Sequence, residues 1–221
     1  MNCRKEQLLL YAVTDRSWLR GETLHEQIEK ALQGGVTFLQ LREKTLSEEE
    51  FLKEALEVKK LCASYHVPLI INDNVEIARK SDADGVHIGQ GDMNVAEARN
   101  ILGPDKIIGV SARTVEQARK AQAEGADYLG SGAVFHTGTK GDAKALDHNV
   151  LKEICASVDI PVVAIGGITK ENIRQLTGLG MDGAAVVSAI FAQKDIKSAA
   201  QELKMILKEM IVSLPGRTRI L

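Results

Sequence analysis

The chain has 221 residues, of which 44% are hydrophobic and 26% are charged, and its formal net charge is −2. This composition is that of an ordinary globular protein and excludes an intrinsically disordered chain, because the apolar residues suffice for a full core. The 28 basic residues are scattered among 30 acidic ones, which excludes a basic surface for nucleic acid or for a membrane and leaves small molecules as the expected partners.

The predicted elements alternate along the whole chain, because each short β-branched apolar run is followed by a longer amphipathic stretch. This alternation predicts parallel strands joined by helices. Strands are predicted at 8–14, 38–42, 68–72, 85–88, 107–111, 128–135, 162–165 and 184–187. Helices are predicted at 24–33, 48–65, 75–80, 95–102, 115–123, 149–157, 171–177 and 197–211.

Eight such units leave about 28 residues each, which suits a closed barrel better than an open sheet. We therefore expect an α/β protein, a single (β/α)8 TIM barrel over residues 1–212, followed by a C-terminal tail over residues 213–221. Three similar segments, SDADGV at 81–86, GADYLG at 125–130 and GMDGAAV at 180–186, place an aspartate just before alternate strands. We interpret this recurrence as turn chemistry.

Polar residues follow most of the predicted strands, at the end of a barrel where functional residues gather. These polar positions are 40–44, 72–73, 90–92, 111, 137–140, 166–167 and 188. Asp73 and Asp92 follow the third and fourth strands, so they are expected within reach of one cation. Magnesium binds a few carboxylates together with water and phosphate oxygens, and the pair predicts a magnesium diphosphate site. The alternative is that each aspartate caps the helix that follows it.

Three cationic side chains, Arg42, Lys44 and Lys140, are expected at the same mouth, where they suit a polyanion. The alternative for either lysine is a solvated or ion-paired surface residue, and a Schiff-base role stays open. Of the histidines, His87 falls inside a strand and is interpreted as a packed, hydrogen-bonded residue, whereas His136 lies in a loop that faces the mouth.

A glycine turn follows the seventh strand in AIGGIT at 164–169, and a helix start follows the eighth in VVSAI at 186–190. Backbone N–H groups at such turns can hold a phosphate, and we favour this interpretation over a tight turn without a ligand. The segment at 130–143 is rich in Gly and Thr and is interpreted as a lid, with hydroxyls at Thr137 and Thr139 for a phosphate. Its alternative is an ordinary hydrophilic loop.

Eight segments together resemble the thiamine phosphate synthase family, in the same order and from Tyr11 to Ile190. These segments are YAVTD, QLREK, IIND, ADGVHIGQGD, IGVSA, GADYLGSGAVFHTGTK, IPVVAIGGIT and DGAAVVSAI. The family uses a (β/α)8 barrel and magnesium to couple a hydroxymethylpyrimidine diphosphate to a thiazole phosphate. The resemblance implies a transferase that loses diphosphate first and leaves a carbocation for the thiazole nitrogen to capture, with no protein nucleophile.

The resemblance also assigns residues to subsites. It implies that the pyrimidine diphosphate is held by Gln40, Leu41, Arg42, Glu43, Lys44, Asn72, Ser111 and Lys140. The thiazole phosphate is assigned to Thr137, Thr139, Gly167, Val187 and Ser188, and Mg²⁺ to Asp73 and Asp92. Arg42, Ser111 and Lys140 are the catalytic residues in this assignment, with Ser111 as a positioning donor. Ala133 and Val134 depart from the family, which often has Gly-Pro at this point of the lid.

Two rival functions are weighed. A related isomerase branch acts on the thiazole carboxylate phosphate and tends to lack the acidic pair and the full REK set, both of which are present here. A non-catalytic barrel that senses a phosphorylated metabolite would need neither Asp73 nor Asp92. The phosphorylated substrates are the only partners that the sequence predicts, and a homo-oligomer stays open because outer helices can pack on a copy without a separate motif.

The cysteines and the N-terminus bear on location. Cys3, Cys62 and Cys155 are isolated and odd in number, which indicates a reducing cytoplasm and no cysteine metal site. The apolar run near the N-terminus is too short for a signal peptide or a membrane span. We therefore expect a cytoplasmic protein without a membrane partner.

Overall fold

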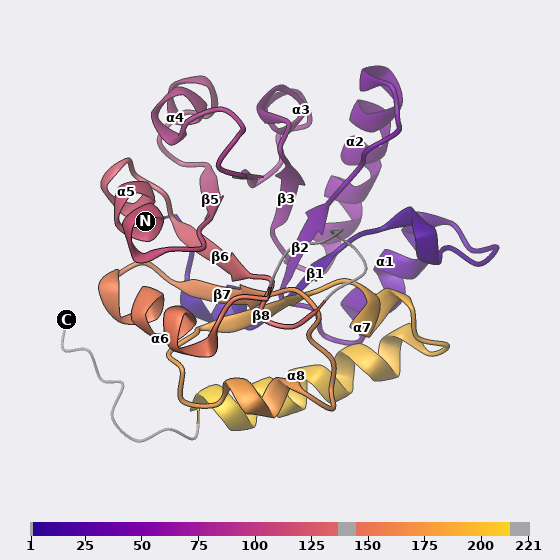
Figure 1. Ribbon diagram of the computed structural model, residues 1–221. Coiled ribbons are helices and arrows are strands. Elements are labelled where there is room, and N and C mark those ends of the chain that lie inside the picture. The colour runs from indigo at the N-terminus through magenta and orange to yellow at the C-terminus, as the bar shows by residue number, and fades with distance from the viewer. Residues whose placement is uncertain (1, 137–144, 213–221) are drawn as a thin grey trace.

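Eight short apolar runs form the strands of a closed parallel barrel (Figure 1). The computed structural model describes residues 2–136 and 145–212. The strands are β1 Leu10–Val13, β2 Phe38–Leu41, β3 Leu69–Asn72, β4 Gly85–Ile88, β5 Ile107–Ser111, β6 Tyr128–Gly132, β7 Val162–Ile165 and β8 Gly183–Val186. Each strand pairs in parallel with its neighbours in the chain, and β1 pairs with β8 to close the barrel. The predicted TIM barrel is confirmed.

Helices follow the strands and surround the barrel (Figure 1). The α-helices are α1 Leu24–Gln33, α2 Glu48–Ser64, α3 Val75–Lys80, α4 Val95–Leu102, α5 Val115–Ala123, α6 His148–Ser157, α7 Ser188–Phe191 and α8 Ile196–Val212. Three 3-10 turns are η1 Lys5–Leu8, η2 Arg16–Trp18 and η3 Ile173–Leu176. In the part of the chain that the structure describes, no helix is both long and apolar enough to cross a membrane.

Three predicted elements need correction. Residue 8 ends η1 rather than opening β1, because the Gln7 side chain accepts a hydrogen bond from the Arg4 N–H and closes a turn there. The helix predicted at 171–177 is only η3, since a single turn fits between Asn172, whose side chain bonds the preceding glycine turn, and Gly178. The strand predicted at 128–135 ends at Gly132.

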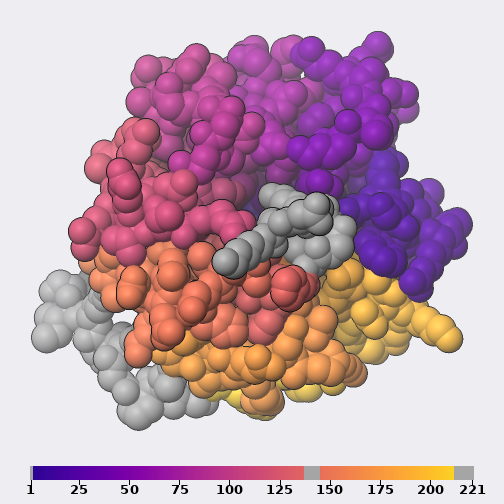
Figure 2. Space-filling view, in the orientation of Figure 1, coloured from indigo at the N-terminus to yellow at the C-terminus, as the bar shows by residue number. Residues whose placement is uncertain are grey.

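The core has two layers because alternate strand residues face into the barrel and out towards the helices. Inside, the rings of Tyr11, Phe38 and Tyr128 meet edge to face with centroids 4.8–5.9 Å apart. All three are buried, and they form an aromatic plug across the barrel. Gly109 makes room for the plug, because a Cβ atom there would overlap the Tyr128 ring. The N-terminal half of the chain forms one side of the molecule and the C-terminal half the other (Figure 2).

The recurring aspartates close the amino ends of the strands. Each exchanges two hydrogen bonds with one residue of the preceding strand, and we call such a pair a clasp. The clasps are Asp84 with Leu69, Asp127 with Ile108, and Asp182 with Val162. In each, the Asp N–H donates to the partner carbonyl and the partner N–H donates to the carboxylate, at 2.7–3.0 Å. Thr37 and Leu10 form a fourth clasp through the threonine hydroxyl, so this arrangement occurs at all even-numbered strands. The aspartates therefore have a structural role, but they bond across to the preceding strand rather than within a turn.

Candidate active site

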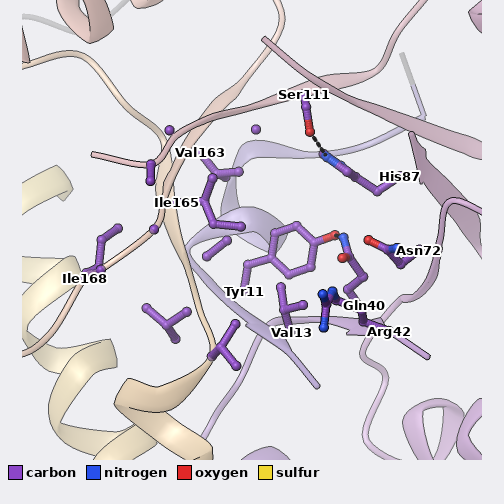
Figure 3. A pocket seen from close by; sticks show the side chains of 18 of the residues that line it. Tyr11, Val13, Gln40, Arg42, Asn72, His87, Ser111, Val163, Ile165 and Ile168 are labelled. Carbon is purple, nitrogen blue, oxygen red and sulfur yellow. Dashed lines mark hydrogen bonds between the residues drawn. The ribbon is translucent and has the colours of Figure 1, made fainter. Parts of the chain in front are cut away.

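A cavity opens at the carboxyl end of the barrel, and every strand or the loop after it contributes to its lining. Of the residues predicted for the site, those that line it are Gln40, Arg42, Asn72, Ser111, Gly167, Val187 and Ser188. Polar side chains from β2 to β5 face apolar ones from β7, among them Val163 and Ile165 (Figure 3). The cavity therefore has a polar wall, formed from β2 to β5, and an apolar wall, formed from β7.

Arg42 brings positive charge to this cavity. Its backbone N–H donates to the Thr14 hydroxyl at 2.9 Å, which fixes the residue just beyond β2. Its guanidinium keeps only a long contact of 3.5 Å with Asp15 among the ion pairs of the described residues. Arg42 is thus held at the cavity with N–H groups available for an anion.

The two predicted metal ligands lie next to each other at the rim. Asp92 is among the neighbours that act on the Asp73 carboxyl, and Lys44 donates to Asp73 at 2.7 Å. Burial raises the pKa of Asp73, but the hydrogen bond and charge of Lys44 outweigh burial and leave the pKa below its usual value. Asp73 is therefore an anion at neutral pH.

Neither aspartate is a helix cap. The caps of α3 and α4 are Asn74 and Asn94, whose side chains accept the N–H groups of the first turns at 2.9 Å. The capping alternative is thereby contradicted. Asp73 instead adopts a left-handed backbone with φ of 61° while its N–H donates to the His87 carbonyl at 2.8 Å. Aspartate is among the residues that adopt this conformation most readily.

A chain of hydrogen bonds crosses the base of the cavity. The Gln40 amide donates to the Tyr11 hydroxyl at 2.6 Å, and this hydroxyl bonds that of Tyr128 at 2.8 Å. His87 bonds the Tyr128 hydroxyl through Nδ1 at 3.0 Å. It bonds the Ser111 hydroxyl through Nε2, also at 3.0 Å (Figure 3). The prediction that His87 is packed and hydrogen-bonded is confirmed. Its position in the lining, and that of Tyr11, were not predicted from the sequence.

Comparison with known proteins identifies the family. Residues 10–190 match the family model described as thiamine monophosphate synthase. The chain belongs to the thiamine monophosphate synthase family. It is 52% identical to a thiamine-phosphate synthase of Clostridium botulinum and 54% to one of Ruminiclostridium cellulolyticum, over 88% of this chain and 92% of each relative. Its structure resembles that of thiamine phosphate pyrophosphorylase from Pyrococcus furiosus, with a TM-score of 0.87 and 39% identity over 94% of this chain and 98% of that one.

Three described residues that the resemblance to this family assigns to substrate do not line the cavity: Leu41, Glu43 and Lys44, the last of which pairs with Asp73. The Leu41 side chain is fully buried in the layer between barrel and helices, because it alternates with Gln40 along β2. The Glu43 carboxylate accepts two hydrogen bonds from Arg16, at 2.8 and 3.0 Å, and Arg16 also pairs with Glu54. The Leu41 and Glu43 side chains hold β2 and its loop in place, and the contacts of these two residues with substrate stay predictions.

The residues that the resemblance assigns to the thiazole phosphate are only partly described. Thr137 and Thr139 lie outside the described residues, as do Lys140, assigned to the pyrimidine diphosphate, and the tail over 213–221. Gly167 and Ser188 line the cavity, as does Val187, which precedes α7. Gly167 has a φ of 66°, and a Cβ atom there would overlap the carbonyl of His136. Packing against the loop after β6 thus accounts for this glycine, and its phosphate contact stays a prediction.

The start of that loop is anchored despite its departure from the family pattern. Val134 is buried, and its N–H donates to the Ile165 carbonyl at 2.9 Å. The Ala133 carbonyl accepts from the Leu146 N–H at 2.7 Å. These contacts hold the first residues of the loop against β7 without the Gly-Pro pair.

Proposed function

We propose that this chain joins a hydroxymethylpyrimidine diphosphate to a thiazole phosphate, forming thiamine phosphate and releasing diphosphate. It is a transferase of thiamine biosynthesis. The observation that carries the proposal is the match of residues 10–190 to the family, since that stretch contributes every predicted residue that lines the cavity.

The proposed chemistry starts with loss of diphosphate. The bond between the pyrimidinylmethyl carbon and the diphosphate oxygen breaks, both electrons leave with oxygen, and the ring stabilises the cation that remains. The thiazole nitrogen then gives its lone pair to that carbon. A nearby water molecule would capture the cation instead, so the apolar wall of Val163, Ile165 and Ile168 supports this route by limiting water.

The described side chains match the needs of this route. Arg42 and Lys44 supply positive charge for the leaving diphosphate, which is the main demand of such a reaction. Ser111 supplies a hydroxyl donor, while Gln40 and Asn72 supply amides for the polar edge of the pyrimidine. Holding both substrates in one cleft replaces a slow encounter by a positioned reaction.

Magnesium fits the pair Asp73 and Asp92. The described residues contain no group of three or more His, Cys, Asp or Glu side chains that could hold a metal ion. A site with two carboxylates suits Mg²⁺, which retains several waters and binds substrate phosphates rather than an all-protein cage. When bound there, the ion would neutralise charge on the diphosphate. We therefore propose a metal site that is completed by substrate.

The decisive experiment supplies purified protein with both substrates, with Mg²⁺ or with EDTA, and measures thiamine phosphate and diphosphate. Equal amounts of both products, formed only with the metal, are expected. Asp73→Asn and Asp92→Asn should raise the Mg²⁺ concentration needed for half-maximal rate. Asp82→Asn is the matched control, because Asp82 is an exposed aspartate that pairs with Lys106.

Two outcomes would contradict the proposal. Absence of thiamine phosphate with Mg²⁺ present refutes the synthase, and isomerisation of the thiazole carboxylate phosphate alone, followed by NMR, would establish the isomerase instead. Undiminished product in EDTA refutes the metal site but not the transferase.

We also propose the cytoplasm as the location and phosphorylated small molecules as the partners. The three cysteines are free and buried, which fits a reducing compartment. Measurement of the thiamine phosphate activity in cell fractions tests the location.

A further inference from the structure

The hydrogen-bond chain from Gln40 to Ser111 links two sides of the cavity through residues that the proposed chemistry does not use. Gln40 lies in β2 and Ser111 ends β5. The connection between them runs through Tyr11, Tyr128 and His87 over four hydrogen bonds of 2.6–3.0 Å. Both tyrosines are buried in the aromatic plug. A continuous polar path through an apolar core indicates a role beyond packing.

Counting protons shows which group donates and which accepts in each hydrogen bond between Gln40 and Ser111. An amide NH₂ only donates, so the Tyr11 oxygen accepts from Gln40. Each hydroxyl has one proton, and an unused proton inside the plug would be costly. The Tyr11 proton therefore goes to Tyr128, and the Tyr128 proton goes to His87 Nδ1. His87 then carries its proton on Nε2 and donates to Ser111.

This direction has a consequence at each end. Ser111 accepts from His87 and keeps its own proton free to point into the cavity. Gln40, with its NH₂ group turned to Tyr11, presents its carbonyl oxygen to the cavity that it lines. Reversing the Gln40 amide would reverse every link together and turn the Ser111 proton towards His87.

Burial keeps the hydroxyls of Tyr11 and Tyr128 protonated, as the proposed hydrogen bonds require. Desolvation raises the pKa of Tyr11, and the pKa of Tyr128 is raised by desolvation together with the neighbouring Tyr11. Both hydroxyls are therefore protonated throughout the working pH range, and each passes one hydrogen bond onward.

We propose that Tyr11, Tyr128 and His87 are positioning residues that fix the Ser111 hydroxyl as a donor and the Gln40 amide as an acceptor towards substrate. This inference rests on the proposed function and extends it. The cavity then matches a substrate with a donor group, such as a ring amine, opposite β2 and an anionic or lone-pair group opposite β5.

The first test is a double-mutant cycle. Tyr128→Phe removes one hydroxyl and keeps the ring, and it should lower kcat about tenfold, the effect of losing about 1.4 kcal/mol of transition-state stabilisation. The KM values should change by less than about twofold, because the residue positions a group that acts in the transition state. In a Ser111→Ala background the same change should lower kcat by clearly less than tenfold, because only its effect through Gln40 remains. Ser81→Ala, which removes a buried hydroxyl at the end of α3, is the control and should leave both constants unchanged.

The second test determines the direction of the hydrogen bonds in the resting protein, without a measurement of turnover. Nitrogen NMR of ¹⁵N-histidine protein, with His87→Gln for assignment, should show His87 as the neutral Nε2–H tautomer. Tyr11→Phe should remove that preference. If Tyr128→Phe does not fold, Tyr11→Phe takes its place in the double-mutant cycle. An Nδ1–H tautomer overturns the direction, and additive effects of Tyr128→Phe and Ser111→Ala overturn the coupling. Wild-type protein that forms no thiamine phosphate refutes the proposed function instead, while the tautomer still decides the inference.

Discussion

Replacing Asp127 by alanine is expected to destabilise the barrel by about 3–4 kcal/mol, and the clasp geometry gives the reason. The Asp127 side chain is 4% exposed and accepts hydrogen bonds from Ile108 N at 2.9 Å and from Arg99 at 2.7 Å. Losing it leaves the buried Ile108 N–H unsatisfied, at a cost of about 1–3 kcal/mol, and removes a charge-assisted bond of about 1.5 kcal/mol or more. Arg99 keeps its bonds to backbone carbonyls, which limits the loss.

Asp84 provides the matched comparison. It forms the same clasp, with Leu69 N at 2.8 Å and Lys59 at 2.7 Å, but its side chain is 36% exposed, so water can reach the freed groups. Asp84→Ala should therefore cost about 1–2 kcal/mol, near the lower end for a lost hydrogen bond. Glu209→Ala breaks only an exposed pair with Arg174 and should cost less than about 0.5 kcal/mol.

Urea unfolding followed by circular dichroism measures all three variants, with the free energy of unfolding extrapolated to water. Equal losses for Asp127→Ala and Asp84→Ala would refute the reasoning, because burial would then not decide the strength of a clasp. A loss for Glu209→Ala as large as either would show that charge removal alone destabilises the chain.

Three further predictions follow from the barrel and its rim. Gly109→Ala forces a methyl group into the Tyr128 ring and should lower the free energy of unfolding by about 1–3 kcal/mol, which thermal melting checks. Lys44→Met should tighten Mg²⁺ binding in the absence of substrate, since Lys44 occupies Asp73 at 2.7 Å, and should lower turnover; weaker binding by calorimetry would contradict this. Burial raises the pKa of Cys62 to about 12, so its thiolate is absent at about pH 8 and a disulfide reagent should label it only after unfolding.

Much of the fold was open to prediction because strand and helix periods differ and turns mark their ends. β4, β5 and β7 have the predicted bounds, since glycine, proline or aspartate flanks each run. The short elements could not be predicted from the sequence, because four residues, as in η3 or α7, are too few to show a hydrophobic period. Tertiary contacts decide them instead.

The site was predictable where barrel geometry fixes the strand ends, as at Gln40, Asn72 and Ser111. The tyrosines of the plug were not recognised, because a large aromatic side chain at the start of a strand looks like core. Alternation along β2 predicts that the Leu41 side chain points away from that of Gln40, and it is buried as expected. The closeness of Asp73 and Asp92 was predictable as well, because they follow neighbouring strands of the barrel.

The aromatic plug also limits where a ligand can lie. Tyr11 belongs both to the plug and to the cavity lining, so a molecule in the cavity lies against the packed core of the barrel. Its depth along the barrel axis is therefore set by the same side chains that hold the strands together.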